Sequence, residues 1–164
     1  MGKPHSRSGL RRKVVTFYLD ECLPYRVAAI LKEVGYPVIS WDEEFQHQQG
    51  FKDPYLIPYM GAKNYVWITK DDSAKKEHEN AIRTEQISVV WLSGLERPSN
   101  KPKQNFITVK DLHRMLTCEL DDIEKTIINS NKPQYFHIGM RSDGKIRKDK
   151  VTLEKYFSKI RVTK

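Results

Sequence analysis

Residues Tyr65–Ser73, Tyr-Val-Trp-Ile-Thr-Lys-Asp-Asp-Ser, decide the fold. The first four are all aromatic or β-branched, without polar alternation, which is typical of a strand buried on both faces of a parallel sheet. Two carboxylates, Asp71 and Asp72, follow directly after Thr69 and Lys70. In open α/β sheets, ligands and catalytic groups lie just beyond the carboxyl ends of the strands. The sequence therefore predicts a candidate site here, although Asp72 or Ser73 could instead simply cap the following helix.

The same pattern occurs earlier in the chain. The apolar run 14–19, Val-Val-Thr-Phe-Tyr-Leu, also ends in a pair of acids, Asp20 and Glu21. If the two strands are parallel neighbours, their acids meet at one edge of the sheet. Such an acidic pocket predicts a bound cation, because carboxylates are costly to bury without one.

The order of the remaining patterns predicts an α/β domain with a parallel sheet. Apolar residues at helical spacing from Val27 to Val34 indicate a helix that begins at Pro24 and is closed by Gly35. A second strand at 36–41 completes a right-handed βαβ unit. Further on we expect a polar loop at 42–52 and then a helix that is opened by Asp53 and Pro54 and disturbed by Pro58. A charged helix at 73–83 and a strand at 87–92 follow, and after them a loop rich in Pro and Lys at 94–105. The last expected elements are a long helix capped by Thr108 and a hairpin within 134–148.

Charge is unevenly distributed along the chain. Of the net charge of +8, residues 1–13 contribute +5 and residues 141–164 contribute +6, which leaves −3 for the body. The basic ends could attract phosphates towards an acidic metal pocket, or they could be solubilising tails.

Composition indicates a cytoplasmic protein without a membrane partner. The apolar runs have strand length, mean hydropathy is −0.66, and the basic N-terminus has no apolar segment of a secretory signal. The two cysteines, Cys22 and Cys118, fit a reducing compartment, and we interpret Cys22 as a small buried filler.

The three best-placed acids suit phosphodiester hydrolysis. That reaction needs an activated water and neutralisation of phosphate charge, and Mg²⁺ or Mn²⁺ supplies both through oxygen ligands. Asp20 and Asp71 follow strands, and Asp53 opens a helix, for which a capping role is an alternative. Thr69 could donate a hydrogen bond to a ligand carboxylate.

Together these motifs resemble the PIN-domain family of metal-dependent ribonucleases, and more narrowly the VapC-like toxins of bacterial toxin–antitoxin pairs. The resemblance covers roughly 14–148. It implies a three-layer α/β/α, Rossmann-like fold with a central, mainly parallel sheet and a small C-terminal hairpin. We therefore divide the chain into a basic tail at 1–13, a PIN-like domain at 14–130 and a basic extension at 131–164.

The resemblance also implies a site and an activity. Asp20, Asp53 and Asp71 would be the catalytic, metal-binding acids, with Glu21 and Asp72 as further metal ligands. Related sequences often carry another acid two positions after the residue that matches Asp71; here that residue is Ser73, which leaves the number of metals open.

The implied activity is that of a Mg²⁺- or Mn²⁺-dependent endoribonuclease in which bound water attacks phosphorus in line. The implied partners are an RNA substrate and a cognate antitoxin, and the resemblance is compatible with a homodimer. Lys70, Lys75 and Lys76 are candidates to bind RNA phosphates.

Two alternatives stay open. A phospho-receiver has similar acids, but no Lys follows the strand at 87–92 in the place where one is needed. A catalytically inactive PIN-like module that binds RNA or a partner is compatible with Ser73.

Overall fold

The computed structural model of the chain describes residues 14–45, 53–70, 76–95, 108–141 and 143–161. Its strands are β1 (Thr16–Leu19), β2 (Val38–Ser40), β3 (Tyr65–Thr69), β4 (Val89–Leu95), β5 (Tyr135–Met140) and β6 (Ile146–Lys150). Its helices are α1 (Tyr25–Glu33), α2 (Trp41–Phe45), α3 (Asp53–Lys63), α4 (Lys76–Thr84), α5 (Val109–Ile128) and α6 (Leu153–Arg161).

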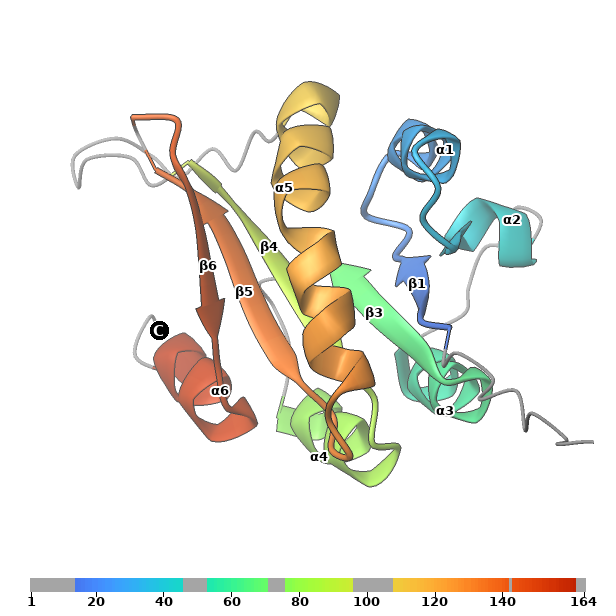
Figure 1. Ribbon diagram of the computed structural model, residues 1–164. Coiled ribbons are helices and arrows are strands. Elements are labelled where there is room, and N and C mark those ends of the chain that lie inside the picture. The colour runs from blue at the N-terminus through green and yellow to red at the C-terminus, as the bar shows by residue number, and fades with distance from the viewer. Residues whose placement is uncertain (1–13, 46–52, 71–75, 96–107, 142, 162–164) are drawn as a thin grey trace, which may run out of the picture.

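The strands form one sheet in the order β2-β1-β3-β4-β5-β6 (Figure 1). All pairs are parallel except β5 with β6, which forms the expected hairpin. Because β5 also pairs with β4, the hairpin continues the central sheet. At its turn, Gly144 has a φ of +78°, a conformation that glycine adopts without strain.

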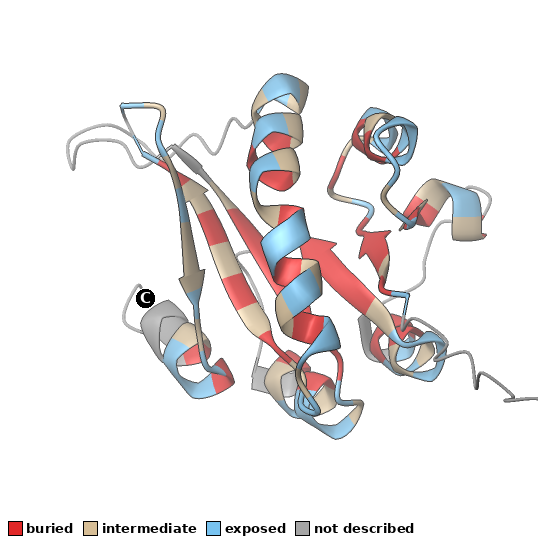
Figure 2. Ribbon diagram, viewed as in Figure 1, coloured by how far each residue is buried: buried red, intermediate tan, exposed pale blue. Residues whose placement is uncertain are grey.

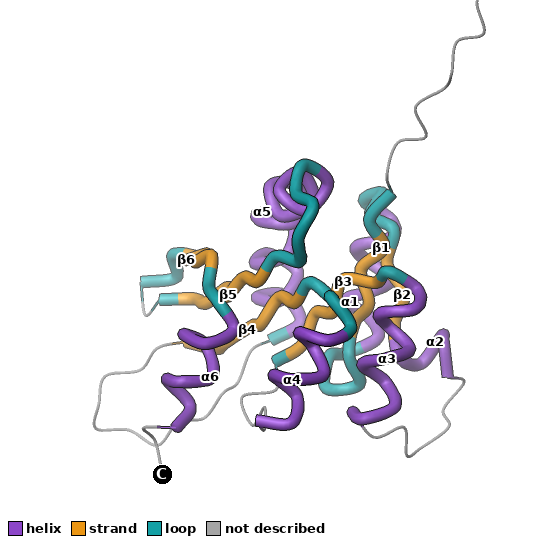
Figure 3. The backbone as a smooth tube through the Cα atoms, turned by 90° about the horizontal axis from the view of Figure 1, so that it is seen from below, coloured by secondary structure: helices purple, strands orange, loops and turns teal. Residues whose placement is uncertain are grey.

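Helices cover both faces of the sheet, so the predicted three-layer α/β/α architecture is confirmed. One apolar cluster joins α1 and α5 to the face that carries Phe17 and Ile68. A second cluster joins α2, α3, α4 and α6 to the face that carries Tyr18 and Trp67. Figure 3 shows this second group of helices on one side of the strands, opposite α5. The inner strands are buried along most of their length (Figure 2), as the absence of polar alternation predicted.

Residues 41–45 correct the expected polar loop. They form the helix α2, in which Trp41 and Phe45 lie one turn apart and are both only 8% exposed. Glu43 accepts a hydrogen bond from the backbone N–H of Ser40 at 2.9 Å, which ends β2 at that residue. The rest of that predicted loop, 46–52, lies outside the described residues.

The sequence patterns predicted helices at α1, α3, α4 and α5, but no helix was predicted at Leu153–Arg161, where the structure has α6. α3 begins at Asp53 and continues through Pro58. Thr108 and Asp111 form a reciprocal capping box at the start of α5, as predicted. α6 packs on the sheet through Trp91 and Tyr156, whose rings stack with centroids 3.8 Å apart. Among the described helices, none combines the length and apolar character needed to cross a bilayer.

Candidate functional site at the carboxyl edge of the sheet

The strand order creates a switch point between β1 and β3. From β1 the chain first adds β2 on one side and then crosses to place β3 on the other. The crevice outside the carboxyl ends of two such strands is where open α/β sheets bind ligands. The register pairs Leu19, the last residue of β1, with Ile68, so β1 ends one residue before β3. Asp20, the first residue after β1, extends this pairing by donating its backbone N–H to Ile68 O at 3.1 Å.

Asp20 is a buried carboxylate held in a defined orientation. The residue is 7% exposed, and its Oδ2 accepts a hydrogen bond from Thr69 Oγ1 at 2.7 Å. Its Oδ1 accepts the backbone N–H of Glu21 at 2.9 Å. Thr69 is itself fully buried at the end of β3. Thr69, named from the sequence as a candidate donor, thus donates to Asp20, and this hydrogen bond connects the ends of β1 and β3.

Cys22 adds a second connection between these strand ends. Its Sγ lies 3.7 Å from Asp20 Oδ2 and 3.6 Å from Thr69 Oγ1, and it accepts the backbone N–H of Lys70 at 3.5 Å. Burial, reinforced by the charge of Asp20, raises the pKa of the Cys22 thiol to about 11, so the thiol stays protonated at neutral pH. Cys22 is half-buried and makes polar contacts, so it does more than fill space. It fixes the backbone immediately before Asp71.

The electrostatic field at this edge is negative. Burial raises the pKa of Tyr18, and the charges of Asp20, Glu44, Glu21 and Asp42 raise it further, in that order. The Tyr18 hydroxyl is buried and has no hydrogen-bond partner among the described residues. Carboxylates that follow β1 and β2 thus add a negative contribution at Tyr18 that is smaller than the effect of burial. Carboxylate oxygens are the donors that Mg²⁺ and Mn²⁺ prefer.

Two of these acids were missed from the sequence. Asp42 and Glu44 belong to α2, which had been expected to be a loop. The run Asp-Glu-Glu directly after a buried strand was a usable signal, because the carboxyl end of β2 lies at the same edge as that of β1. Glu44 also accepts a hydrogen bond from Tyr59 Oη of α3, which fixes its side chain against the second helix layer.

The other predicted site residues are placed only in part. Glu21 is exposed, and Lys70 follows β3 and is half-buried. Asp53 and Lys76 are the first residues of α3 and α4, and only their backbone is described. Asp71, Asp72 and Lys75 lie outside the described residues. Within the described ranges, no three metal-ligating side chains gather at one point, so the three-acid site remains a prediction.

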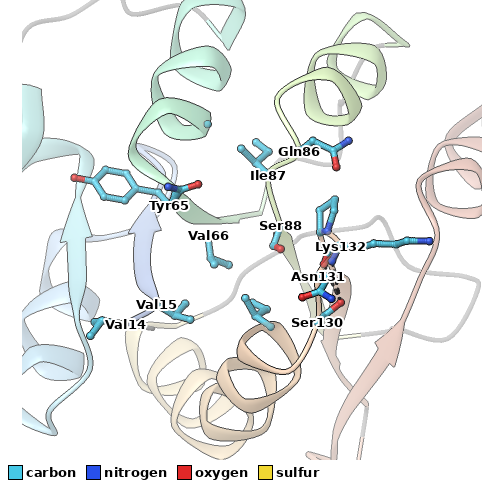
Figure 4. A pocket seen from close by; sticks show the side chains of 14 residues that line it. Val14, Val15, Tyr65, Val66, Gln86, Ile87, Ser88, Ser130, Asn131 and Lys132 are labelled. Atoms are coloured by element: carbon cyan, nitrogen blue, oxygen red, sulfur yellow. Dashed lines mark hydrogen bonds between the residues drawn. The ribbon is translucent and has the colours of Figure 1, made fainter. Parts of the chain in front are cut away.

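A hollow lies at the opposite, amino edge of the sheet (Figure 4). It has a volume of about 390 Å³ and is lined by residues that precede or begin strands, among them Val15, Asn64, Ser88 and Lys132. No carboxylate, imidazole or thiol lines it. This hollow therefore offers no metal-ligating side chain, whereas the carboxyl edge offers a buried carboxylate.

One of the comparisons with known proteins gave a match. Residues 15–94 match the family model described as a PIN like domain, a stretch just under half of the chain. Neither the curated proteins nor the solved structures gave a match. The matched stretch contains β1 to β3, most of β4, and the buried Asp20 between β1 and α1. The protein has an α/β PIN-like fold, and over residues 15–94 it is similar to PIN-like domains.

Proposed function

We propose that the protein is a Mg²⁺- or Mn²⁺-dependent endoribonuclease of PIN type. The observation that carries this proposal is the buried Asp20 carboxylate at the switch point between β1 and β3, oriented by Thr69. A carboxylate so placed is costly unless a cation or hydrogen bonds compensate it. The similarity to PIN-like domains, which are generally nucleases, supports the same activity.

In this proposal Asp20 is the central metal ligand, and Asp53 and Asp71 complete the site. Asp71 comes two residues after Thr69, which ends the strand next to β1, and Asp53 opens α3. A bound divalent cation would supply the charge neutralisation and the water activation that phosphodiester hydrolysis needs. Thr69 and the backbone of Glu21 donate hydrogen bonds to the Asp20 carboxylate, and Cys22 accepts the backbone N–H of Lys70, the residue before Asp71. Glu21 and Asp72 are further candidate ligands.

The proposal extends to biological context through the resemblance of the motifs to VapC-like toxins. In that context a free nuclease is harmful, so a cognate antitoxin would cover or distort the carboxyl edge. We place the protein in the cytoplasm, with RNA as substrate and Lys70, Lys75 and Lys76 as phosphate contacts. A homodimer is compatible with this proposal.

A catalytically inactive PIN-like module that binds RNA or a partner is the second candidate. The observation that favours it is Ser73, which stands where related sequences often carry an acid. Metal affinity separates the two functions, because an inactive module does not need to hold a divalent cation.

The test is Mg²⁺- or Mn²⁺-dependent cleavage of a mixed pool of structured and unstructured RNAs. Wild type is compared with Asp20→Asn, Asp71→Asn and a surface control, Glu33→Gln on α1. We expect cleavage that requires metal, disappears in both Asp variants and persists in the control. Metal binding without cleavage points to a narrow target, and tRNA and rRNA are then tried. Absence of metal binding by wild type refutes the nuclease and favours the inactive module.

A further inference from the structure

The hollow at the amino edge of the sheet is bordered by turns that join a helix to the strand after it. α3, α4 and α5 all end at this edge, and residues from the turns that follow them, Asn64, Gln86 and Asn131, line the hollow. Asn64 and Gln86 both have a φ of 55°, the left-handed conformation with which many helices end. Each turn therefore brings a carboxamide residue to the border of the hollow.

Branched aliphatic side chains supply the apolar part of the hollow. Val15, Val66 and Ile127 line it, and each is less than a tenth exposed. Its volume of about 390 Å³ lies within the roughly 300–1,000 Å³ of small-molecule sites, which combine apolar surface with a few polar groups. The hollow thus has the size and composition to hold a small molecule with an apolar face.

Ser88 places a buried donor in the hollow. The residue is 8% exposed, and its Oγ accepts the backbone N–H of Gln134 at 2.9 Å. A hydroxyl also has a proton to donate, and in the described part of the chain that proton has no acceptor. Figure 4 shows Ser88 and Asn131 across the hollow from Val15 and Val66. An acceptor atom on a ligand would satisfy this donor, which is costly to leave unpaired when it is buried.

The side chains that face the hollow are uncharged. No carboxylate is found among the described residues that line it, and their single cation is Lys132. The side chain of Lys132 extends away from the other side chains labelled in Figure 4. A charged ligand is costly to bury without an opposite charge. The hollow therefore favours an uncharged ligand that carries both hydrogen-bond donors and acceptors.

We propose that this hollow binds an uncharged nucleoside, with adenosine as the best match. The carboxamide of Asn131 would pair with the adenine edge in a bidentate manner, donating to N7 and accepting from the N6 amine. Ser88 would donate to a ribose oxygen, and the base would pack on Val15 and Val66. The proposal is independent of the nuclease function, because the hollow and Asp20 lie at opposite edges of the sheet.

The test is the binding of adenosine to the full chain, measured by calorimetric titration in EDTA. We expect saturable binding of adenosine, and no tighter binding of adenosine monophosphate, because no cation faces the hollow. Asn131→Ala should lose roughly 5- to 150-fold in affinity for adenosine. The matched control is Asn129→Ala at the end of α5, an exposed asparagine that does not line the hollow and should bind as wild type.

An adenosine analogue in which C–H replaces N7 separates recognition by Asn131 from a merely structural effect. Wild type should bind the analogue more weakly than adenosine, whereas Asn131→Ala should bind the two equally, because its contact to N7 is already lost. The proposal is overturned if wild type does not bind adenosine, if Asn131→Ala binds it as wild type does, or if Asn131→Ala still distinguishes the analogue. Tighter binding of adenosine monophosphate than of adenosine would overturn the assignment to an uncharged ligand.

Discussion

Replacement of Thr69 by Val tests whether the end of β3 orients the candidate metal ligand. Valine keeps the shape of threonine but removes the hydroxyl that donates to Asp20 Oδ2 at 2.7 Å. Thr69 is fully buried and Asp20 is 7% exposed, so water does not replace the lost donor at full strength. A hydrogen bond to a charged group contributes about 1.5–3 kcal/mol. We expect Thr69→Val to lower the free energy of unfolding by that amount in EDTA.

The same change should weaken metal binding. Loss of a hydrogen bond that orients a ligand typically lowers metal affinity about 10- to 100-fold. Urea unfolding in EDTA measures the stability, and calorimetric titration with Mn²⁺ measures the affinity. Thr69→Ser is the matched control, because it keeps the hydroxyl while it loses a methyl group. Serine should retain most of the metal affinity, although the lost methyl lowers stability by about 1 kcal/mol.

The reasoning is refuted if Thr69→Val changes the free energy of unfolding by less than about 0.5 kcal/mol and leaves the Mn²⁺ affinity unchanged. Changes in stability as small as that are typical of exposed positions. A Thr69→Ser protein that binds Mn²⁺ as poorly as Thr69→Val would also refute it, since the hydroxyl would then not matter. A double-mutant cycle with Asp20→Asn isolates the pair: the two effects should not add, because the residues are in direct contact.

Three further predictions concern the rest of the fold. Tyr18→Phe removes a buried hydroxyl that lacks a hydrogen-bond partner among the described residues, so it should stabilise the metal-free protein by about 1 kcal/mol in urea unfolding. Burial, together with a 2.6 Å hydrogen bond to Asp121, raises the pKa of Tyr36 from 10.0 to about 12. Its folded state then holds the proton more tightly than the unfolded state, so stability is lost as pH rises from 10 to 12; Tyr36→Phe should flatten this pH profile. Gly61→Ala should lower the melting temperature despite the higher helix propensity of Ala, because a Cβ there would lie 2.9 Å from Glu85 Cβ and 3.2 Å from its carbonyl oxygen.

The sequence was sufficient to predict the position of Asp20 but not all of its contacts. A buried apolar run that ends in an acid places that acid at the carboxyl end of a strand, wherever the strand lies in the sheet. The sequence named Thr69 as a candidate donor, but that Asp20 is its acceptor follows only from the pairing of β1 with β3, which aligns Leu19 with Ile68. Such a pairing joins residues far apart in sequence, and local patterns do not encode it. The contacts of Cys22 depend on the same pairing.

The helix α2 shows a different limit of sequence reasoning. It has five residues, fewer than two turns, so the helical spacing of its apolar residues does not repeat. A segment this short cannot be distinguished from a loop by its sequence pattern. Its buried pair, Trp41 and Phe45, is separated by one turn, which identifies a helix only when the sheet face that they cover is known. In contrast, the long α5 repeats its apolar positions over 20 residues and carries a capping box, so both its type and its start could be predicted.

The negative field at the carboxyl edge comes from two separate connections of the sheet. Asp20 and Glu21 follow β1, whereas Asp42 and Glu44 lie on α2 after β2, and all four raise the pKa of Tyr18. Of these acids, Asp20 is buried and oriented by a neighbouring strand, while the others are exposed or half-exposed. If the proposed metal site exists, attraction of a cation and its coordination would therefore fall to different residues. In the proposed nuclease, the α2 acids would draw a divalent ion towards the edge, and Asp20, which accepts a hydrogen bond from Thr69, would coordinate it.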